Sequence, residues 1–309
     1  MLAAGPTGRK LTMRISVIIA TRNRVQQLAR CLESFDRVAY GGAWEVVVVD
    51  NNSTDETANY IRENQGRFRF DLVYCLETKP GPSSARNTGA SKSRGEILVF
   101  TDDDCYPAED YLECVDHFFS SQPEVGFGGG RVLLHDPTDL PLTLQEQNQP
   151  KDLIAGSFLV SGVIHGANMV FRREVFYSVQ GFDEVLGPGR FFCSGEDTDL
   201  LRRTLCLGFT GKYDPSLVIY HHHGRKTSAD QKKLQASYDR GMGAGFMKQL
   251  LYRPQKRLVL KMFYWHLQTM PLARRLRQVW YFVLYGCHAV FSPVGVQSHQ
   301  SGLGRKSLQ

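Results

Sequence analysis

Four short apolar segments, separated by stretches with helical signals, constrain the fold of the first hundred residues. They lie at 14–20, 44–50, 70–76 and 97–101, and we predict a β-strand at each. The second and the fourth are too apolar for strands that face solvent on one side, so we expect both faces of the sheet to be covered. Strands that alternate with helices predict a doubly wound α/β sheet, parallel in this half of the chain.

The connections between these strands carry three different helix signals. Apolar residues recur at helical spacing between residues 25 and 35. Ser53 followed by Glu56 predicts a capping box at the start of the second helix. The third connection is a turn at 79–82 followed by a helix rich in small residues at 83–94. Helices at these positions supply the crossovers that parallel strands need.

Three consecutive aspartates, Asp102, Asp103 and Asp104, follow the fourth predicted strand directly. In an open α/β sheet, ligands bind outside the carboxyl ends of the strands. Three carboxylates there would raise one another's pKa unless a cation lay among them. Mg²⁺ or Mn²⁺ carrying a phosphorylated substrate fits this pattern, and an acidic turn that caps the next helix is the alternative. An EF-hand loop is excluded because its sixth position needs glycine and Pro107 stands there.

Beyond Pro107 the predicted elements alternate less regularly. We predict a helix at 108–120, strands at 125–134 and 164–171, and a polar surface loop at 136–152. No GxGxxG motif follows the first strand and no GxxxxGK[ST] motif occurs, so phosphate binding by a glycine loop is unsupported. Three further glycines at 241–245 lie in a helical, polar segment that we interpret as a hinge.

Acidic residues open another predicted helix, and a histidine run follows it. Glu196, Asp197 and Asp199 stand where the helix dipole favours negative charge, so helix capping alone could explain them. Two short strands, predicted at 210–213 and 217–220, lead to the run 221–223. An isolated histidine run is more often structural or solvated than ligating.

The basic character of the chain belongs to its last part. From Lys248 to Gln309 there are ten Lys and Arg residues and no acid, and because the whole chain has a net charge of +6, residues 1–247 carry −4. The apolar, aromatic segments 258–265 and 279–291 are shorter than the roughly 20 residues of a spanning helix. Aromatic and cationic residues together suit a helix in the interface of an anionic membrane, and packing on the rest of the protein is the alternative.

The cysteine pattern and the first residues of the chain indicate the cellular compartment in which we expect the protein. Seven scattered cysteines form no CxxC pair and no zinc spacing, which predicts reduced thiols and a cytoplasmic protein. The apolar run 15–20 is too short for the core of a signal peptide. With the basic segment, these features predict a peripheral location on the inner face of the membrane.

The order of the pieces is more specific than any one of them. Over roughly residues 14–225 the chain resembles the family 2 glycosyltransferases with the GT-A fold. The matching pieces, in chain order, are VIIATRN (17–23), VVVDNNSTD (47–55), SARNTGA (84–90), FTDDD (100–104), GANM (166–169), GFDE (181–184) and GEDTDL (195–200).

The resemblance implies a GT-A fold, a doubly wound mixed sheet with a Rossmann-like N-terminal half. It divides the catalytic domain 14–245 into a nucleotide-binding half, 14–107, and an acceptor half, 108–245. We expect residues 1–13 to form a flexible tail. A basic, aromatic helical extension is expected at 246–309, associated with the membrane and with a flexible end.

Nucleotide binding is implied for residues near the strand ends. Asp50 corresponds to the acid that accepts the N–H of a uracil- or thymine-type base, and Arg86 is placed to contact the base or the diphosphate. The predicted nucleotide-binding residues are Thr21, Arg22, Asp50, Asn52, Arg86, Asp102 and Asp103. The donor is predicted to be a UDP-sugar, with dTDP and GDP as open alternatives.

Metal binding is implied for the outer acids of the DXD motif. Asp104 is the predicted ligand of Mn²⁺ or Mg²⁺, and Asp102 is predicted to contact the metal or the ribose. Asp103 is the variable middle position and is expected to point away. His222 is the predicted further ligand, although the sequence does not select it over His221 and His223.

The implied reaction is displacement at the anomeric carbon of a nucleotide sugar. Asp197 corresponds to the general base for an acceptor hydroxyl, and a single base without a protein nucleophile implies inversion. Glu196 and Asp199 are predicted to shape the acceptor pocket or to orient Asp197, and Asn168 to contact the donor sugar or the acceptor. Processive members carry a QxxRW motif after the catalytic acid, which is absent from 200–208, so we predict transfer of a single sugar to a glycan or lipid-linked acceptor.

Three other classes are weighed against this prediction. A non-catalytic nucleotide-sugar-binding protein would keep the pocket, but would not need both the DXD acids and Asp197. A sugar nucleotidyltransferase normally opens with a glycine- and arginine-rich phosphate loop, which is absent here. No RNA- or DNA-binding module is visible, so we expect no nucleic-acid partner.

Overall fold

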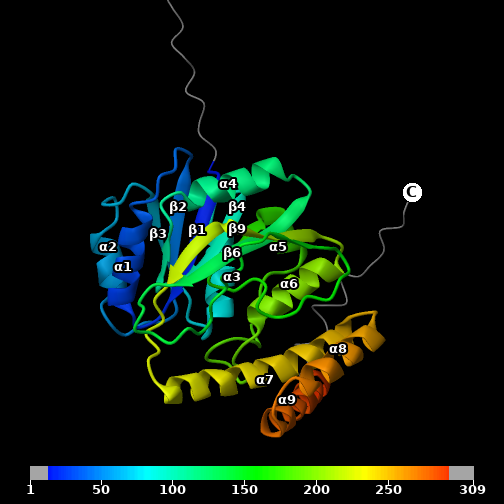
Figure 1. Ribbon diagram of the computed structural model, residues 1–309. Coiled ribbons are helices and arrows are strands. Elements are labelled where there is room, and N and C mark those ends of the chain that lie inside the picture. The colour runs from blue at the N-terminus through cyan, green and yellow to red at the C-terminus, as the bar shows by residue number, and fades with distance from the viewer. Residues whose placement is uncertain (1–12, 292–309) are drawn as a thin grey trace, which may run out of the picture.

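The computed structural model describes residues 13–291, and a mixed β-sheet forms its centre (Figure 1). Its strands are β1 (Ile15–Thr21), β2 (Trp44–Asp50), β3 (Asp71–Leu76), β4 (Ile97–Asp102), β5 (Cys105–Pro107), β6 (Val125–Leu134), β7 (Lys151–Leu153), β8 (Met169–Arg172) and β9 (Thr210–His221). Within the described residues the strand order is β3-β2-β1-β4-β8-β6-β9-β5, and β7 pairs with β9.

Helices connect and cover these strands. They are α1 (Val25–Phe35), α2 (Thr57–Glu63), α3 (Pro82–Lys92), α4 (Tyr111–Ser121), α5 (Arg173–Ser178), α6 (Glu196–Cys206), α7 (Ser228–Tyr252), α8 (Lys256–Gln268) and α9 (Leu272–Phe291). Among the helices described between residues 13 and 291, none has the length and hydropathy of a membrane-spanning segment.

The parallel, doubly wound half is confirmed. β1 pairs in parallel with both β2 and β4, and β2 pairs in parallel with β3. Val17 packs with α1, α2 and α4 on one face of the sheet, whereas the adjacent Ile18 packs with α3, α5 and α6 on the other. The register aligns Thr21 with Asp50 and Ala20 with Asp102, so the carboxyl ends of these strands meet at one edge of the sheet.

The second half makes the sheet mixed, as expected. β8 is antiparallel to both β4 and β6, and it starts only at Met169, five residues later than predicted. The two short strands predicted at 210–213 and 217–220 are one strand, β9, which continues through Pro215. The pairing of β6 with β9 shifts register beside Gly130, where a Cβ atom would lie 2.1 Å from the carbonyl oxygen of Leu217.

Two local predictions are wrong. Ser53 does not cap α2: its amide donates to Asp50 and its hydroxyl accepts from the amide of Asn23, while α2 starts later, at Thr57. The Oδ1 atom of Asp55 accepts from the amide and the hydroxyl of Thr57 instead. The hinge predicted at 241–245 is absent, because α7 runs unbroken for 25 residues.

The glycines of α7 serve close packing. A Cβ atom at Gly243 would lie 2.2 Å from the carbonyl oxygen of Gln278 in α9, and one at Gly241 would lie 2.1 Å from the Ser194 hydroxyl. Only glycine permits these approaches of helix backbone to neighbouring chain. α7, α8 and α9 lie together on one side of the sheet and its covering helices, and we call them the helical unit (Figure 1).

Buried charges fasten the helical unit to the rest of the protein. The Nζ atom of Lys248 in α7 lies 2.5 Å from a carboxylate oxygen of Asp183 and 2.7 Å from one of Asp199 in α6. Within the helical unit, the buried Asp239 pairs with Arg274 and Arg277 of α9. The division of the chain between residues 245 and 246 stays a prediction, and α7 runs across it. The predicted flexible tail, apart from Met13, and the flexible C-terminal end lie outside the described residues.

Candidate active site

A cleft of about 510 Å³ opens at the carboxyl ends of β1 and β4, and we call it the main cleft. Its volume lies in the range of about 300–1,000 Å³ that is typical of small-molecule sites. Polar and charged residues from both halves of the chain line it: Thr21, Arg22, Arg24, Asn51, Arg86, Asp102, Asp103, Asp104, His165, Glu196, Asp197, His221, Arg225 and Tyr238.

Each of the three consecutive aspartates has its own partner. Asp102 accepts a 2.7 Å hydrogen bond from Arg86, and Asp103 accepts one of 2.7 Å from the hydroxyl of Thr21. Asp104 accepts a 2.7 Å bond from Arg24, whose Nε atom also lies 3.3 Å from Asp103. Asp103 therefore points toward the first strand, and Asp102 is the most exposed of the three.

The environments of the two buried aspartates push their pKa values apart. Burial raises the pKa of Asp103 to about 7, although the nearby Arg24 opposes this shift. Burial would also raise the pKa of Asp104, but the hydrogen bonds and charges of His221 and Arg24 hold it below its usual range. Asp104 is thus the carboxylate of the pair that stays ionised at neutral pH.

Asp102, Asp104 and His221 form a group that can hold a divalent cation. Their candidate ligand atoms, with that of Cys105, all lie within 4.8 Å of one another, and His221 Nε2 is 3.4 Å from Asp104 Oδ1. Burial keeps the pKa of Cys105 well above its ordinary value, so this thiol is protonated and is a poor ligand for a hard cation. Two carboxylates and one imidazole, with positions left for water and phosphate oxygens, fit Mn²⁺ or Mg²⁺.

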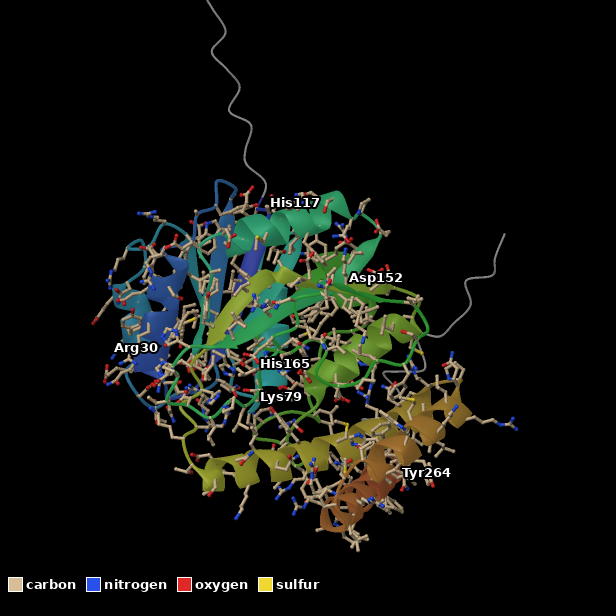
Figure 2. All side chains as sticks on the ribbon, viewed as in Figure 1. Arg30, Lys79, His117, Asp152, His165 and Tyr264 are labelled. Carbon is tan, nitrogen blue, oxygen red and sulfur yellow. The ribbon has the colours of Figure 1, made fainter. Side chains whose placement is uncertain are left out.

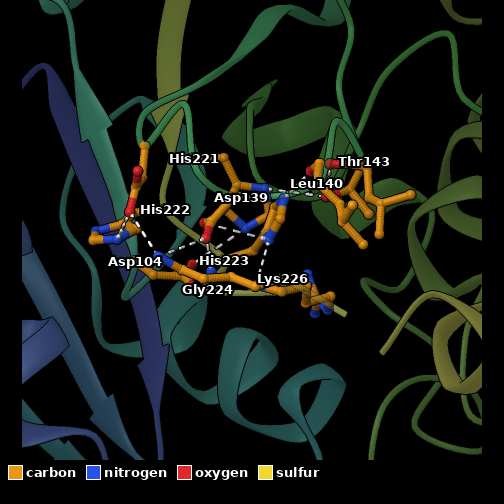
Figure 3. A network of polar contacts seen from close by, with 12 residues as sticks. Asp104, Asp139, Leu140, Thr143, His221, His222, His223, Gly224 and Lys226 are labelled. Carbon is orange, nitrogen blue, oxygen red and sulfur yellow. Dashed lines mark hydrogen bonds and ion pairs between the residues drawn. The ribbon is translucent and has the colours of Figure 1, made fainter. Parts of the chain in front are cut away.

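The structure separates the three histidines, as Figure 3 shows. The amide of His222, the predicted ligand, donates to the carbonyl oxygen of Asp104, but its ring has other partners: Nδ1 is 3.3 Å from the Tyr106 hydroxyl and Nε2 is 3.7 Å from Asp136. His223 bonds through Nε2 to the carbonyl oxygen of Leu140. Among the three, His221 takes the position beside Asp104 because it is the last residue of β9 and pairs with Cys105 of β5, whereas His222 and His223 lie beyond the strand.

Glu196 and Asp197 reach the main cleft from the first turn of α6. Glu196 is buried, 3.2 Å from Arg86, and burial together with the charge of Asp197 raises its pKa to about 7. Asp197 is half-buried and accepts from the amides of Gly166 and Thr198, at 3.2 and 2.6 Å. Arg86 links the two halves of the site, since it contacts both Asp102 and Glu196.

Other predicted site residues lie outside the cleft lining. Asp50 is buried and accepts from the Ser53 amide and the Tyr74 hydroxyl, and Asn52 is exposed with a φ of 61°. Between them, Asn51 does line the cleft. It fixes the loop before α3 by accepting from the amide of Gly81.

Asn168 and Asp199 hold the fold together. The side chain of Asn168 is fully buried, donates to two backbone carbonyls and accepts from the Tyr111 hydroxyl, so it does not reach the cleft. The carboxylate of Asp199 bonds Lys248 and Arg203 and anchors α7. Asn168 thus stabilises the fold, whereas Asp199 anchors α7 and also lines a cavity that adjoins the main cleft.

Sequence reasoning missed several residues that line the main cleft, among them Arg24, His165, Arg225 and Tyr238. Arg24 had a usable signal, since it follows the VIIATRN segment directly. His165 immediately precedes the GANM segment, and it lies between the sheet and α7 (Figure 2). Burial lowers the pKa of His165 despite the opposing charge of Asp197, so its ring is neutral at neutral pH. Tyr238 is contributed by α7 and could not be placed without the packing of that helix.

Comparisons with known proteins agree with this architecture. A profile described as "Glycosyl transferase family 2" matches residues 16–179. Glycosyltransferase AglE of Haloferax volcanii is 35% identical over 208 residues, which are 67% of this chain and 66% of that protein. Alignments with the first curated relatives cover between 44% and 66% of their lengths, so the chain spans less than two thirds of each.

Solved structures share the fold. The mannosyltransferase PcManGT from Pyrobaculum calidifontis, in complex with GDP-Man and Mn²⁺, has a TM-score of 0.62 at 20% identity. The superposed region covers 91% of this chain and 76% of the PcManGT chain. S. aureus TarS 1–349 in complex with UDP-GlcNAc has a TM-score of 0.58 at 16% identity, and the superposed region covers 91% of this chain and 74% of the TarS chain. The GT-A arrangement expected from the sequence is thus confirmed.

Proposed function

This chain belongs to glycosyl transferase family 2 and is a glycosyltransferase, and we propose that it is an inverting, metal-dependent enzyme that moves one sugar from a UDP-sugar to an acceptor hydroxyl. One observation carries the proposal. The half-buried Asp197 lines the same cleft as the candidate metal group, which consists of Asp102, Asp104 and His221. Arg86 connects the two, because it pairs with Asp102 and with Glu196, the neighbour of Asp197.

The acids and arginines of the main cleft suit a metal–diphosphate pair. Asp102, Asp104 and His221 would hold Mn²⁺ or Mg²⁺, in place of the predicted set with His222. When bound there, the cation would neutralise the negative charge that develops on the leaving diphosphate. Arg24 and Arg86 offer guanidinium donors to phosphate oxygens at the same edge. UDP remains the proposed nucleotide, supported by Thr21 and Arg22 in the cleft, whereas the Asp50 side chain at the end of β2 lies outside the cleft lining.

Asp197 is the proposed general base. The acceptor oxygen attacks the anomeric carbon, the bond from that carbon to the diphosphate oxygen breaks, and its electron pair leaves with the diphosphate. The acceptor proton passes to the Asp197 carboxylate, which the helix dipole of α6 and two backbone amides keep oriented. Attack opposite the leaving group inverts the anomeric configuration.

The helical unit is the proposed membrane-binding part. Large apolar side chains on α8 and α9 are exposed: Leu260, Tyr264, Trp265, Leu272, Leu276, Trp280, Val283, Val290 and Phe291. Tyr264 lies on the outer side of the unit (Figure 2). Lys256, Arg257 and Lys261 are exposed on the same helices. This combination supports a peripheral location on the inner face of the membrane and a lipid-linked or glycan acceptor.

A donor screen tests the proposal. The purified chain is incubated with UDP-, GDP- and dTDP-sugars, with Mn²⁺ or with EDTA, and release of nucleoside diphosphate is measured. We expect Mn²⁺-dependent turnover of a UDP-sugar that EDTA abolishes. Binding of UDP without any turnover would instead support a nucleotide-sugar-binding protein, and release of pyrophosphate would support a nucleotidyltransferase.

A further inference from the structure

A second cavity of about 340 Å³ adjoins the main cleft on the side of the helical unit. The two share Thr143, His165, Ser194, Gly195, Asp197 and Tyr238 as lining residues. Asp197 therefore lies at their junction. A hydroxyl group presented from the second cavity can meet this carboxylate while a nucleotide sugar fills the main cleft.

The helical unit builds the far wall of the second cavity. Gly245 of α7, His266 of α8, and Arg274 and Gln278 of α9 all line it. Apart from its own helix backbone, a Cβ atom at Gly245 would have one near neighbour, Arg202 Nη1 at 4.0 Å. A larger side chain at this position would occupy the cavity beside Arg202.

Arg202 lines the cavity as a buried cation that forms no ion pair with the part of the chain that the structure describes. It is 2% exposed, its Nε atom donates to the carbonyl oxygen of Leu159 at 3.0 Å, and its Nη2 atom lies 3.5 Å from the Ser161 hydroxyl. Its guanidinium packs over the rings of Phe158 and Phe246. Within residues 13–291 it has no ion pair. A buried charge without a partner is costly, so such a group marks a place for an opposite charge.

The other charged groups around the second cavity already have partners. The carboxylate of Asp199 is shared by Lys248 and Arg203. Arg274 pairs with Asp239, and His266 bonds Gln278 while burial lowers its pKa, so its ring is neutral at neutral pH. Burial lowers the pKa of Arg202 to about 10, against the attraction of the Asp199 and Asp197 charges, so its own charge persists. Arg202 is therefore the cation at the inner end that no carboxylate of the described residues reaches within ion-pair distance.

We propose that the second cavity holds the acceptor, and that this acceptor carries an anionic group, a phosphate or a carboxylate, which pairs with Arg202 while its hydroxyl meets Asp197. The inference rests on the proposed function, because it presumes that Asp197 serves an acceptor. Arg202 follows Asp197 by five residues on α6, about 7.5 Å along the helix axis. In such an acceptor the hydroxyl and the anionic group lie several ångströms apart. The helical unit, which forms the far wall of the cavity, then contributes to acceptor selection as well as to the proposed membrane binding.

Binding of matched probes tests the charge preference. Octyl phosphate, glucose 6-phosphate and glucuronic acid are titrated into the full chain with UDP and Mn²⁺ present, beside the neutral octanol and glucose. At least one anionic probe should bind about tenfold or more tightly than its neutral counterpart, since hydrogen bonds to charged groups are the stronger ones. Preference for octyl phosphate identifies a lipid-linked acceptor, and preference for glucose 6-phosphate or glucuronic acid identifies a soluble one.

Three variants tie the preference to this cavity. Arg202→Gln should abolish it, Arg202→Lys should restore part of it, and Gly245→Leu should block all probes by filling the cavity. Arg240→Gln, which removes an exposed cation from α7, is the matched control and should leave probe binding unchanged. Retained UDP binding, measured in each variant, shows that the main cleft is intact.

The outcomes separate this inference from the proposed function. Equal binding of anionic and neutral probes by the wild-type chain overturns the inference, and so does a preference that survives in both Arg202→Gln and Gly245→Leu. Should the wild-type chain bind no nucleotide with Mn²⁺ while the probes still discriminate by charge, the proposed function fails and the anion site stands.

Discussion

The main cleft and the second cavity differ in how their charges are balanced. In the main cleft, carboxylates and guanidinium groups alternate, as in the pairs of Asp102 with Arg86 and Asp104 with Arg24. A cation and a diphosphate can enter such a site together, each meeting the groups of opposite sign. In the second cavity, Arg202 forms no ion pair with any residue between 13 and 291, although the charges of Asp199 and Asp197 attract it. The difference teaches that a buried charged side chain without an ion pair favours a ligand of the opposite charge.

The two cavities are also built by different kinds of segment. Strand ends and the start of α6 supply the acids of the main cleft, and the residues at the strand ends are close to one another because of the parallel sheet. The second cavity depends on the docking of α7, α8 and α9 against α6. Changes at the first should alter chemistry, whereas changes at the second should alter stability and acceptor choice.

The largest expected effect concerns Asp197, which both cavities share. Asp197→Asn keeps the size of the side chain but removes the proton acceptor, so sugar transfer should fall roughly 10²–10⁴-fold. UDP binding with Mn²⁺, measured by calorimetry, should stay at the wild-type level. Asp152→Asn, at an exposed carboxylate of β7, is the control (Figure 2). Near-complete transfer activity in Asp197→Asn would remove the base from the mechanism.

The attachment of the helical unit is tested through Lys248. Lys248→Met removes the buried cation that pairs with the half-buried Asp183 and with Asp199, which keeps only Arg203, and this should destabilise the protein by about 3 kcal/mol. Urea unfolding followed by circular dichroism measures this loss, with the exposed Lys232→Met as the control. A loss no larger than that of the control would mean that the helical unit is held by its apolar contacts alone.

The same ion pairs predict a pH dependence of stability. Burial would raise the pKa of Asp183 and of Asp199, but the charge of Lys248 holds both below their ordinary value. Because these folded-state pKa values are depressed, the stabilisation is present above the unfolded value of about 3.9 and is lost as the pH falls below it. Unfolding midpoints between pH 7 and 3 should therefore decline less in Lys248→Met than in the wild-type protein. A parallel decline in both would contradict the assignment.

The choice of metal ligand is tested by adjacent histidines. His221→Ala should weaken Mn²⁺ binding by at least the roughly 10–100-fold that loss of an outer partner of a metal site costs. His222→Ala is the matched control, since its ring contacts Tyr106 and Asp136 instead. Electron paramagnetic resonance of free Mn²⁺ measures both affinities. The reverse result would restore the ligand predicted from the sequence.

The smallest expected effect concerns the outer face of the helical unit. Lys261→Gln removes one exposed cation and should weaken binding to phosphatidylserine vesicles by about 1 kcal/mol, roughly fivefold. Cosedimentation measures the partitioning, and vesicles of neutral lipid should show no difference between variant and wild type. Binding that ignores both the substitution and the lipid charge would argue against a membrane role for this face.

Much of the main cleft could be predicted because its signals are local. The strand ending in Asp102–Asp104, the acids that open α6 and the alternation of strands with helices are each contained in a few consecutive residues. The histidine run shows the limit. His221 is the last residue of β9, whereas His222 and His223 follow it outside the strand, so the choice of His221 needed the end of β9 and its register against β5.

The sequence by itself determined the parallel half of the sheet and the triple aspartate at its edge, because strand periodicity and the position of polar residues after a strand depend on neighbours along the chain. Only the tertiary structure decided that the Asn168 side chain is buried away from the main cleft, that Asp199 pairs with Lys248, that the glycines of α7 are packing contacts, and that Arg202 forms no ion pair within residues 13–291. Each of these facts depends on groups brought together from distant parts of the chain, and the partners of a buried polar group are not encoded by its sequence neighbours.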